Sequence, residues 1–152
     1  MKVISSIDDA LAAVGEELGF SGWLLVDQDR IDLFAEATGD HQWIHVDAAR
    51  AKAESPYGTT IAHGLLTLSL IPALSKQCFI LENTRMGINY GFNKVRFIAP
   101  VPVDSRVRVT SVLADGTKID DSTVQLTVRH TVEIQGSEKP VAVAEMIGRY
   151  LF

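Results

Sequence analysis

The sequence predicts an α+β domain in which one buried helix lies on an antiparallel sheet. Three observations support this prediction. Helical signals fill the first half of the chain and stop after Ile80. The segment from Leu65 to Leu74 is apolar on every side of a helix, which is typical of a buried helix. The segment from Val124 to Ile134 alternates apolar and polar residues, which is typical of a half-buried strand.

The composition is that of an ordinary globular protein. The chain has 152 residues, of which 47% are hydrophobic and 22% charged, so a single domain over residues 1–152 is expected. A net charge of -5 argues against a nucleic-acid-binding protein, which would carry a basic face. The N-terminus has no apolar signal core and no apolar run is long enough to span a bilayer. We therefore expect a cytoplasmic protein with no membrane partner.

The elements of the first half are predicted from caps and apolar spacing. Helices are expected over residues 10–14, 31–38 and 48–53, with a strand over residues 22–26. Asp29 is the expected N-cap of the second helix, and Gly39 is placed to end it and to lead the chain into Asp40. Asp47 is the expected cap of the third helix. Pro72 should kink or shorten the buried helix.

The second half is predicted to be a run of strands. They are expected over residues 90–99, 106–110, 124–134 and 141–150. Asp115-Gly116 and Gln135-Gly136-Ser137 are turn signals between them. The single cysteine, Cys78, rules out an internal disulfide and fits a reducing compartment. Its place in an apolar stretch favours a small buried residue over a nucleophile.

The residues with the clearest chemistry lie between Gly39 and Leu66. Asp40 and His45 form a possible acid/base pair on a loop. The triplet from Ala62 to Gly64 opens the buried helix, whose first N–H groups are unpaired and carry a partial positive charge. An acid/base pair beside such a helix end is what proton transfer next to a carbonyl requires.

The other histidines are interpreted as structural. His41 and His45 have the spacing of a metal pair on a helix, but Gly39 argues against a continuous helix there. No cysteine or glutamate completes a ligand set, so no metal is expected. His63 is expected to fix the helix start through a hydrogen bond, and His130 lies at an alternating strand position.

The motif Gly39-Asp40-His41-Gln42-Trp43-Ile44-His45-Val46-Asp47, followed by Ile61-Ala62-His63-Gly64, resembles the hydratase motif of the MaoC-like dehydratases. It is most similar to the nodulation-protein-N-type subset, as are residues 88–97 and 100–103. The resemblance implies a hot-dog fold, a curved antiparallel sheet around a long central helix. It also implies reversible hydration of trans-2-enoyl-CoA to (R)-3-hydroxyacyl-CoA. Gln42 and Trp43 stand where many members have Asn and Pro, which leaves substrate length open.

The resemblance also assigns roles to individual residues. Asp40 and His45 fall on the catalytic pair, and the backbone N–H of Gly64 falls on the oxyanion donor. It implies a homodimer, and no cofactor apart from the coenzyme A of the substrate. The residues expected to line the substrate channel are His63, Asn89, Tyr90, Asn93 and Lys94, although the last four are equally well interpreted as polar groups at a sheet edge. Two interpretations also apply to three cationic residues, which either contact the phosphates of CoA or are simply solvated: Arg85, Lys94 and Arg96.

Three rival functions remain open at this point. The first is an acyl-thioester hydrolase, which would release free thiol. The second is a dehydratase that acts on acyl carrier protein, with or without a partner subunit. The third is a non-catalytic acyl-CoA-binding protein. Fold-level analogy alone does not choose among them.

Overall fold

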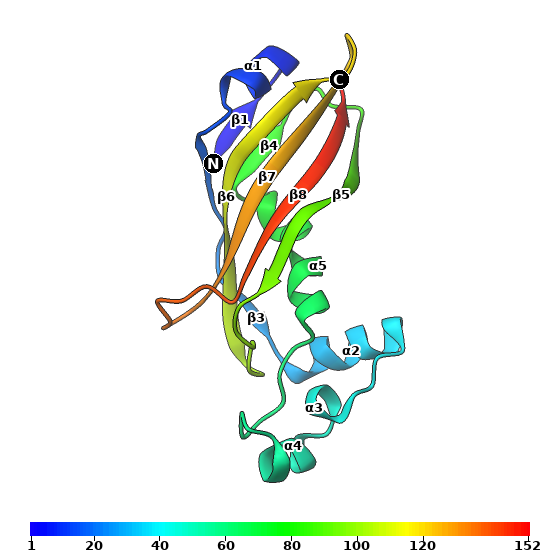
Figure 1. Ribbon diagram of the computed structural model, residues 1–152, viewed down its shortest axis with the longest axis vertical. Helices are drawn as coiled ribbons and strands as arrows, with labels where there is room; N and C mark the ends of the chain where they lie inside the picture. Colours follow the sequence, from blue (N-terminus) through cyan, green and yellow to red (C-terminus); the bar gives the residue numbers. More distant parts are fainter.

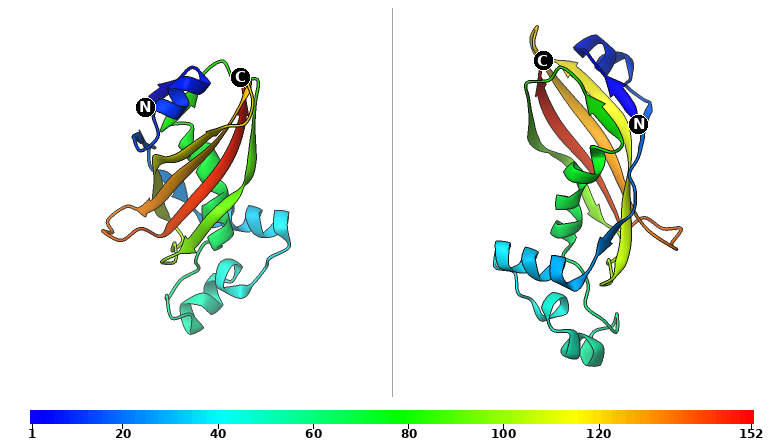
Figure 2. Two further views of the ribbon diagram at one scale, coloured as in Figure 1. Left: turned by 45° about the horizontal axis from the view of Figure 1, so that its top comes forward. Right: turned by 180° about the vertical axis from the view of Figure 1, so that it is seen from behind.

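A computed structural model describes residues 1–152 and shows a curved sheet on one side of a central helix. This helix, α5 (Gly64–Ser75), runs along the sheet, and three short helices cluster beyond its N-terminal end (Figure 1). Figure 2 shows from behind that α5 lies against the concave face of the sheet. The α+β prediction, with the main helix on an antiparallel sheet, is confirmed.

The main sheet has six strands in the order β2-β6-β7-β8-β5, with β3 also paired to β6. All of these pairings are antiparallel. The bounds are β2 Glu17–Phe20, β3 Leu24–Val26, β5 Met86–Phe97, β6 Ser105–Lys118, β7 Thr123–Ile134 and β8 Ala142–Leu151. A separate two-stranded sheet pairs β1 (Lys2–Ile4) in parallel with β4 (Phe79–Leu81). Strand β5 is therefore an edge of the main sheet.

Two apolar clusters hold these layers together. The larger one joins α5 to the sheet, where Leu66, Ile71 and Leu74 pack with inward residues such as Val109 and Val132. The smaller cluster lies under α1 (Ile7–Ala12) and the far ends of β6 and β7. The period-2 pattern predicts this arrangement because alternate residues of β7 face the core.

The three clustered helices are α2 (Gln28–Thr38), α3 (Trp43–Val46) and α4 (Ala48–Glu54). Asp47 caps α4 as expected, by accepting a hydrogen bond from the Arg50 N–H at 2.9 Å. Gly39 ends α2 in the left-handed conformation, with φ 76°, also as expected. The prediction of Asp29 as the cap of α2 is wrong. Asp27 has that role because its carboxylate meets the Arg30 N–H at 3.0 Å, while Asp29 lies in the first turn.

The prediction of a turn at Asp115-Gly116 is also wrong. Both residues lie inside β6, at a register shift where the strand bulges, and the chain turns only after Lys118. A Cβ at Gly116 would lie 3.2 Å from a methyl group of Leu11 and 3.3 Å from one of Val14. The glycine therefore serves close packing of the N-terminal region on the strand, not reversal of the chain.

The central helix is less enclosed than its sequence predicts. It includes Pro72 and continues to Ser75. Leu65 is 59% exposed and Ala73 is exposed as well, so one face of α5 is uncovered in the single chain. The expectation of a helix buried on all sides is therefore wrong. No helix has both the length and the apolarity needed to cross a membrane.

Candidate active site

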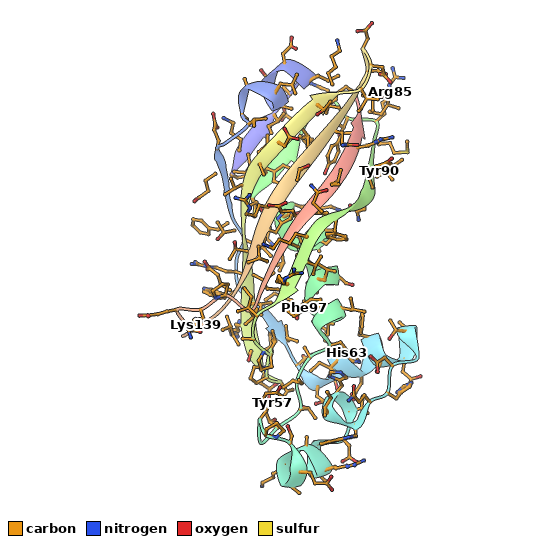
Figure 3. The ribbon with its side chains drawn as sticks, viewed as in Figure 1. Tyr57, His63, Arg85, Tyr90, Phe97 and Lys139 are labelled. Carbon is orange, nitrogen blue, oxygen red and sulfur yellow. The ribbon has the colours of Figure 1, made fainter.

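The candidate site lies where the helical cluster meets the N-terminus of α5 and the end of β5. A cavity of about 350 Å³ opens there. Its polar lining comes from His45, Tyr57 and Thr67, and Gly64 and Phe97 form part of the wall. Figure 3 shows Phe97 at the end of the sheet that faces Tyr57 and His63. The remaining lining residues are Ile61, Ala62, Ile98, Ala99, Pro100, Val101 and Val141.

His45 is held in one tautomer by the main chain. It lies on α3, only 7% exposed, and its Nδ1 is 2.7 Å from the carbonyl oxygen of Ile61. A carbonyl only accepts, so Nδ1 carries the proton and Nε2 keeps a free lone pair. Burial is the largest influence on the pKa of His45 and lowers it below 6.5. The bond to Ile61 and the charge of Asp40 oppose this effect, whereas His63 adds to it. The ring is thus favoured in the neutral form that accepts a proton.

His63 joins the start of α5 to the loop that carries Asp40. Its Nε2 donates to the main-chain carbonyl oxygen of Asp40 at 2.9 Å. Its ring stacks on that of His45, with centroids 3.8 Å apart and planes inclined by 24°, and touches Phe34 on another side. The Nδ1 atom of His63 is buried and has no hydrogen-bond partner. This histidine therefore fixes the relative positions of Asp40 and His45.

Asp40 lies on the loop between α2 and α3, with an exposed side chain. One carboxylate oxygen accepts a long hydrogen bond of 3.3 Å from the Gln42 N–H. Ligand atoms of Asp40, His45 and His63 all lie within 4.8 Å of one another. Asp40 lies on a loop, as expected. His45 was expected on the same loop but lies on a one-turn helix.

The same three residues are poorly arranged to hold a metal ion. An imidazole nitrogen binds a metal in the plane of its ring at about 2.0–2.1 Å. The rings of His45 and His63 are stacked and nearly parallel, so an ion in one ring plane lies away from the other. The arrangement suits proton transfer between a carboxylate and an imidazole better than chelation.

Gly64 provides a backbone donor at the edge of the cavity. It is the first residue of α5, and its N–H makes no hydrogen bond within the chain. No side chain caps this helix end, so its partial positive charge faces the cavity. A Cβ at Gly64 would lie 3.0 Å from the ring of Phe97, which packs directly on it. The helix end is open to a small anionic group and closed to a side chain.

The other predicted channel residues lie elsewhere in this chain. Asn89, Tyr90, Asn93 and Lys94 are on β5, and none lines the cavity beside His45. Asn89 lines a second cavity, of about 580 Å³, near the C-terminal end of α5. Tyr90 is half exposed and far from His63 in Figure 3, with the guanidinium of Arg149 3.7 Å from its ring centroid. Their role toward a substrate stays a prediction.

The charged residues considered beside them are also outside the cavity. His41 is exposed and lies 3.5 Å from a carboxylate oxygen of Glu36. Lys94 and Arg96 are exposed on β5, and Arg85 follows β4 at the far end of the sheet (Figure 3). A role for these cations on CoA phosphates stays a prediction too.

Sequence reasoning missed four residues that shape the site. They are Gln28, Thr60, Ile61 and Phe97, of which Ile61 holds His45 and Phe97 covers Gly64. Gln28 and Thr60 share a hydrogen bond of 2.6 Å beside His45. Phe97 falls within the strand predicted over residues 90–99, but that prediction does not place it against α5. Contacts between residues 32 positions apart leave no local signal in one sequence.

Comparisons with known proteins agree with one another. The profile described as MaoC like domain matches residues 9–134. The 3-hydroxyacyl-thioester dehydratase Z of Mycobacterium tuberculosis is 54% identical over 151 residues, covering 99% of each chain. Nodulation protein N of Rhizobium meliloti is 49% identical over 144 residues, covering 93% of this chain and 89% of that protein. The solved R-hydratase PhaJ1 from Pseudomonas aeruginosa has a TM-score of 0.68 at 25% identity, over 89% of this chain and 79% of its own. The hot-dog fold is thereby confirmed.

Proposed function

The chain belongs to the MaoC-like dehydratase family and is a hydro-lyase, and from this premise we propose that it hydrates trans-2-enoyl-CoA reversibly to (R)-3-hydroxyacyl-CoA. One observation carries the proposal. His45 is held with its proton on Nδ1, beside the Asp40 carboxylate and a cavity that the unpaired N–H of Gly64 also borders. A relative named as a dehydratase of 3-hydroxyacyl thioesters supports the substrate class.

The reaction needs a base, an acid and a place for negative charge. Water adds to Cβ of the double bond, so one O–H bond breaks and one C–O bond forms. The proton leaves the water for the pair formed by His45 and Asp40, and the same proton equivalent is returned to Cα. The pair ends the cycle in its starting protonation state. The addition of water needs no external oxidant or reductant. Neutral His45, with its lone pair on Nε2, fits the role of proton acceptor.

Charge develops on the thioester oxygen between the two proton transfers. The Gly64 N–H and the N-terminal end of α5 are fixed donors that meet this oxygen without rearrangement. Phe97, Val101 and Val141 make the wall of the same cavity apolar, which lowers the local dielectric and strengthens that interaction. The scheme uses no cofactor apart from the coenzyme A within the substrate.

The proposal is tested by following the enoyl absorbance of crotonyl-CoA and of longer trans-2-enoyl-CoA substrates. Loss of enoyl absorbance with an (R)-3-hydroxyacyl-CoA product and no free thiol is the expected result. Release of free thiol would identify a hydrolase instead. Faster turnover of the same acyl group on acyl carrier protein would move the assignment to the carrier-bound substrate. Binding without turnover of any of these would identify an acyl-binding protein.

We further propose that two copies of the chain form a symmetric homodimer. β5 has no neighbour on its outer side, and its half-exposed apolar side chains include Ile88, Tyr90 and Phe92. The uncovered face of α5 also exposes the apolar side chain of Leu65. An unpaired apolar edge is a site for association with another strand. A dimer that covers β5 brings the predicted channel residues of one copy toward its partner.

Sedimentation tests this assembly. The wild type should sediment as a dimer at micromolar concentration, and Ile88→Lys with Phe92→Lys should shift it toward monomer. The matched control is Ile119→Lys with Leu33→Lys, which places the same two charges on exposed apolar residues outside β5 and α5. A wild type that is active as a monomer would contradict the proposal.

A further inference from the structure

The side chain of Gln28 bridges three segments around His45. It is the first residue of α2, and its Nε2 donates to the main-chain carbonyl oxygen of His45 at 2.7 Å and to Asp32 Oδ1 at 2.8 Å. Its Oε1 accepts from the hydroxyl of Thr60 at 2.6 Å. Both N–H groups and the carbonyl of the amide are therefore in use.

These contacts allow only one orientation of the amide. Nε2 faces a carbonyl and a carboxylate, which are both acceptors, so a flipped amide would bring its oxygen against two acceptors. Thr60 is only 1% exposed, so its hydroxyl has no ready replacement partner in water. The position of Gln28 is thus determined by hydrogen bonds on both sides of the amide.

The bonds close a ring that includes the imidazole of His45. Gln28 binds the main chain of His45 and the side chain of Thr60. Ile61, which follows Thr60 in the sequence, accepts a hydrogen bond from His45 Nδ1 at its carbonyl oxygen. The Ile61 N–H in turn donates to the carbonyl oxygen of Ile44 at 3.1 Å. The Gln28 amide and this main-chain bond therefore together set the distance between the backbone of His45 and the carbonyl that holds its ring.

Helix α3 cannot hold this geometry by itself. It has four residues and no side-chain N-cap, and one helical turn is not stable in isolation. Without Gln28 the carbonyl of His45 and the hydroxyl of Thr60 would lose their partner together. The segment at Thr60 and Ile61 would then be held only by main-chain bonds, such as those to Ile44 and from Val103, and the looser contact would let the ring of His45 rotate or change tautomer.

We propose that Gln28 is a positioning residue that acts through Thr60 and His45 to keep the Nδ1–H tautomer and to orient Nε2 toward the cavity. The inference rests on the proposed role of His45 as proton acceptor. Gln28 does not line the cavity, so it acts on the substrate only through His45. Its loss should reduce turnover while leaving substrate affinity nearly unchanged.

The test compares Gln28→Ala with Asp32→Ala. The first variant removes the whole bridge, and the second removes only the bond that does not reach His45. Gln28→Ala should lower kcat roughly 10- to 100-fold with KM within about twofold, as expected for a misplaced catalytic group. Asp32→Ala should stay within about twofold of wild type in both constants. A folded Gln28→Ala with wild-type kcat would overturn the proposal, as would an equal loss in Asp32→Ala.

Two further measurements separate positioning from a general loss of structure. Burial holds the pKa of His45 down, so release of the ring should raise it and move the acidic limb of the kcat/KM profile to higher pH. Nitrogen-15 NMR should show His45 as the Nδ1–H tautomer in wild type and in Asp32→Ala, and a mixture of tautomers in Gln28→Ala. An unchanged limb and tautomer in Gln28→Ala would overturn the proposal.

Thr60→Val breaks the same ring at another bond if Gln28→Ala does not fold. Thr60→Val should shift the acidic limb in the same direction by a smaller amount. Thr60→Ser, which keeps the hydroxyl, should have the wild-type profile. No effect of Thr60→Val on the limb or on the tautomer would count against the proposal. The NMR result does not depend on turnover, so a wild type inactive on every enoyl-CoA would refute the proposed function without deciding the role of Gln28.

Discussion

Two buried histidines of this chain have similar surroundings but differ in whether they can transfer a proton. His45 at the helical cluster and His130 in β7 each use Nδ1 in one hydrogen bond, to the Ile61 carbonyl at 2.7 Å and to the Ser111 hydroxyl at 2.9 Å. Burial lowers the pKa of both. The difference lies at Nε2. That of His45 remains available beside a cavity and a carboxylate, whereas that of His130 is enclosed without a partner.

The comparison shows what makes a titratable group chemically useful. A lowered pKa keeps both rings neutral, but only His45 lies within reach of a second proton-transfer group and a space for substrate. His130 has no cavity, so its burial acts on the stability of the fold instead. Two experiments test this division between a histidine for chemistry and a histidine for stability, and a third tests the backbone donor that borders the same cavity as His45.

The largest effect is expected at the pair Asp40 and His45. Asp40→Asn and His45→Gln keep the size of each side chain but remove its ability to exchange a proton. A positioned acid or base contributes roughly 10²–10⁴-fold, so each variant should lose about that factor in kcat, or about 3–5 kcal/mol of barrier. The measurement is the steady-state hydration of crotonyl-CoA.

The double variant is the internal control for that experiment. If the two residues share one water, the combined loss should be far smaller than the product of the single losses. Losses that multiply would show two independent roles. Full activity in both single variants would remove Asp40 and His45 from the mechanism.

The next effect is the acid sensitivity caused by His130. Burial lowers the pKa of this ring from 6.5 to about 4, so the folded state does not take up the proton that the unfolded state binds below pH 6.5. The stability associated with neutral His130 is complete above pH 6.5 and is lost as the pH falls toward 4. The gap predicts a loss of about 3 kcal/mol over that window. Denaturant unfolding at several pH values should show it.

His130→Gln keeps a hydrogen-bonding atom for Ser111 and removes the titration. It should therefore have a flatter dependence of unfolding free energy on pH than wild type, whatever its stability at neutral pH. Ser111→Ala is the matched control because it retains the buried ring and should retain the acid sensitivity. Identical slopes in wild type and His130→Gln would show that other groups cause the acid loss.

The smallest of the three effects is expected at Gly64. Its Cβ contact with Phe97 requires a shift of a few tenths of an ångström, so Gly64→Ala should displace the ring and narrow the approach to the N–H. We expect a loss of about tenfold in kcat/KM, or about 1.4 kcal/mol, with the fold intact. Adding Phe97→Leu should recover part of the loss. A folded Gly64→Ala with normal kinetics would place the oxyanion donor elsewhere.

The sequence was informative where one residue type has a local reason to be in place. Gly39 ends α2 and Asp47 caps α4 because such termini need those residues. The alternation from Val124 to Ile134 predicted β7, since a half-buried strand imposes that period. Asp40, His45 and Gly64 were found together because their motifs are close in the sequence. The structure places His45 and Gly64 in the wall of one cavity, with Asp40 close to His45.

The features that the sequence missed depend on contacts between distant residues. Strands β1, β2 and β4 have three or four residues each, too few for a periodic signal. Asp115-Gly116 has the composition of a turn, but packing by α1 makes a glycine useful inside a strand. The hydrogen bonds of Gln28 and the contact of Phe97 with Gly64 likewise follow from the folded arrangement alone.

The placement of α2, α3 and α4 beyond the sheet has a consequence for cooperativity. Helix α2 contributes Ile31 and Phe34 to the larger apolar cluster, whereas α3 and α4 have no residue in it and mainly contact the neighbouring helices. A hydrogen bond from the Val103 N–H to the Thr60 carbonyl links the segment after α4 to the sheet region. Segments with few contacts to the main core open at lower free energy than the core itself. The segment that carries Asp40 and His45, which is α3 with the loop before it, can therefore open while β6, β7 and β8 stay paired. The fraction of molecules whose sheet is folded and the fraction whose candidate active site is intact are then two different populations, each with its own temperature dependence.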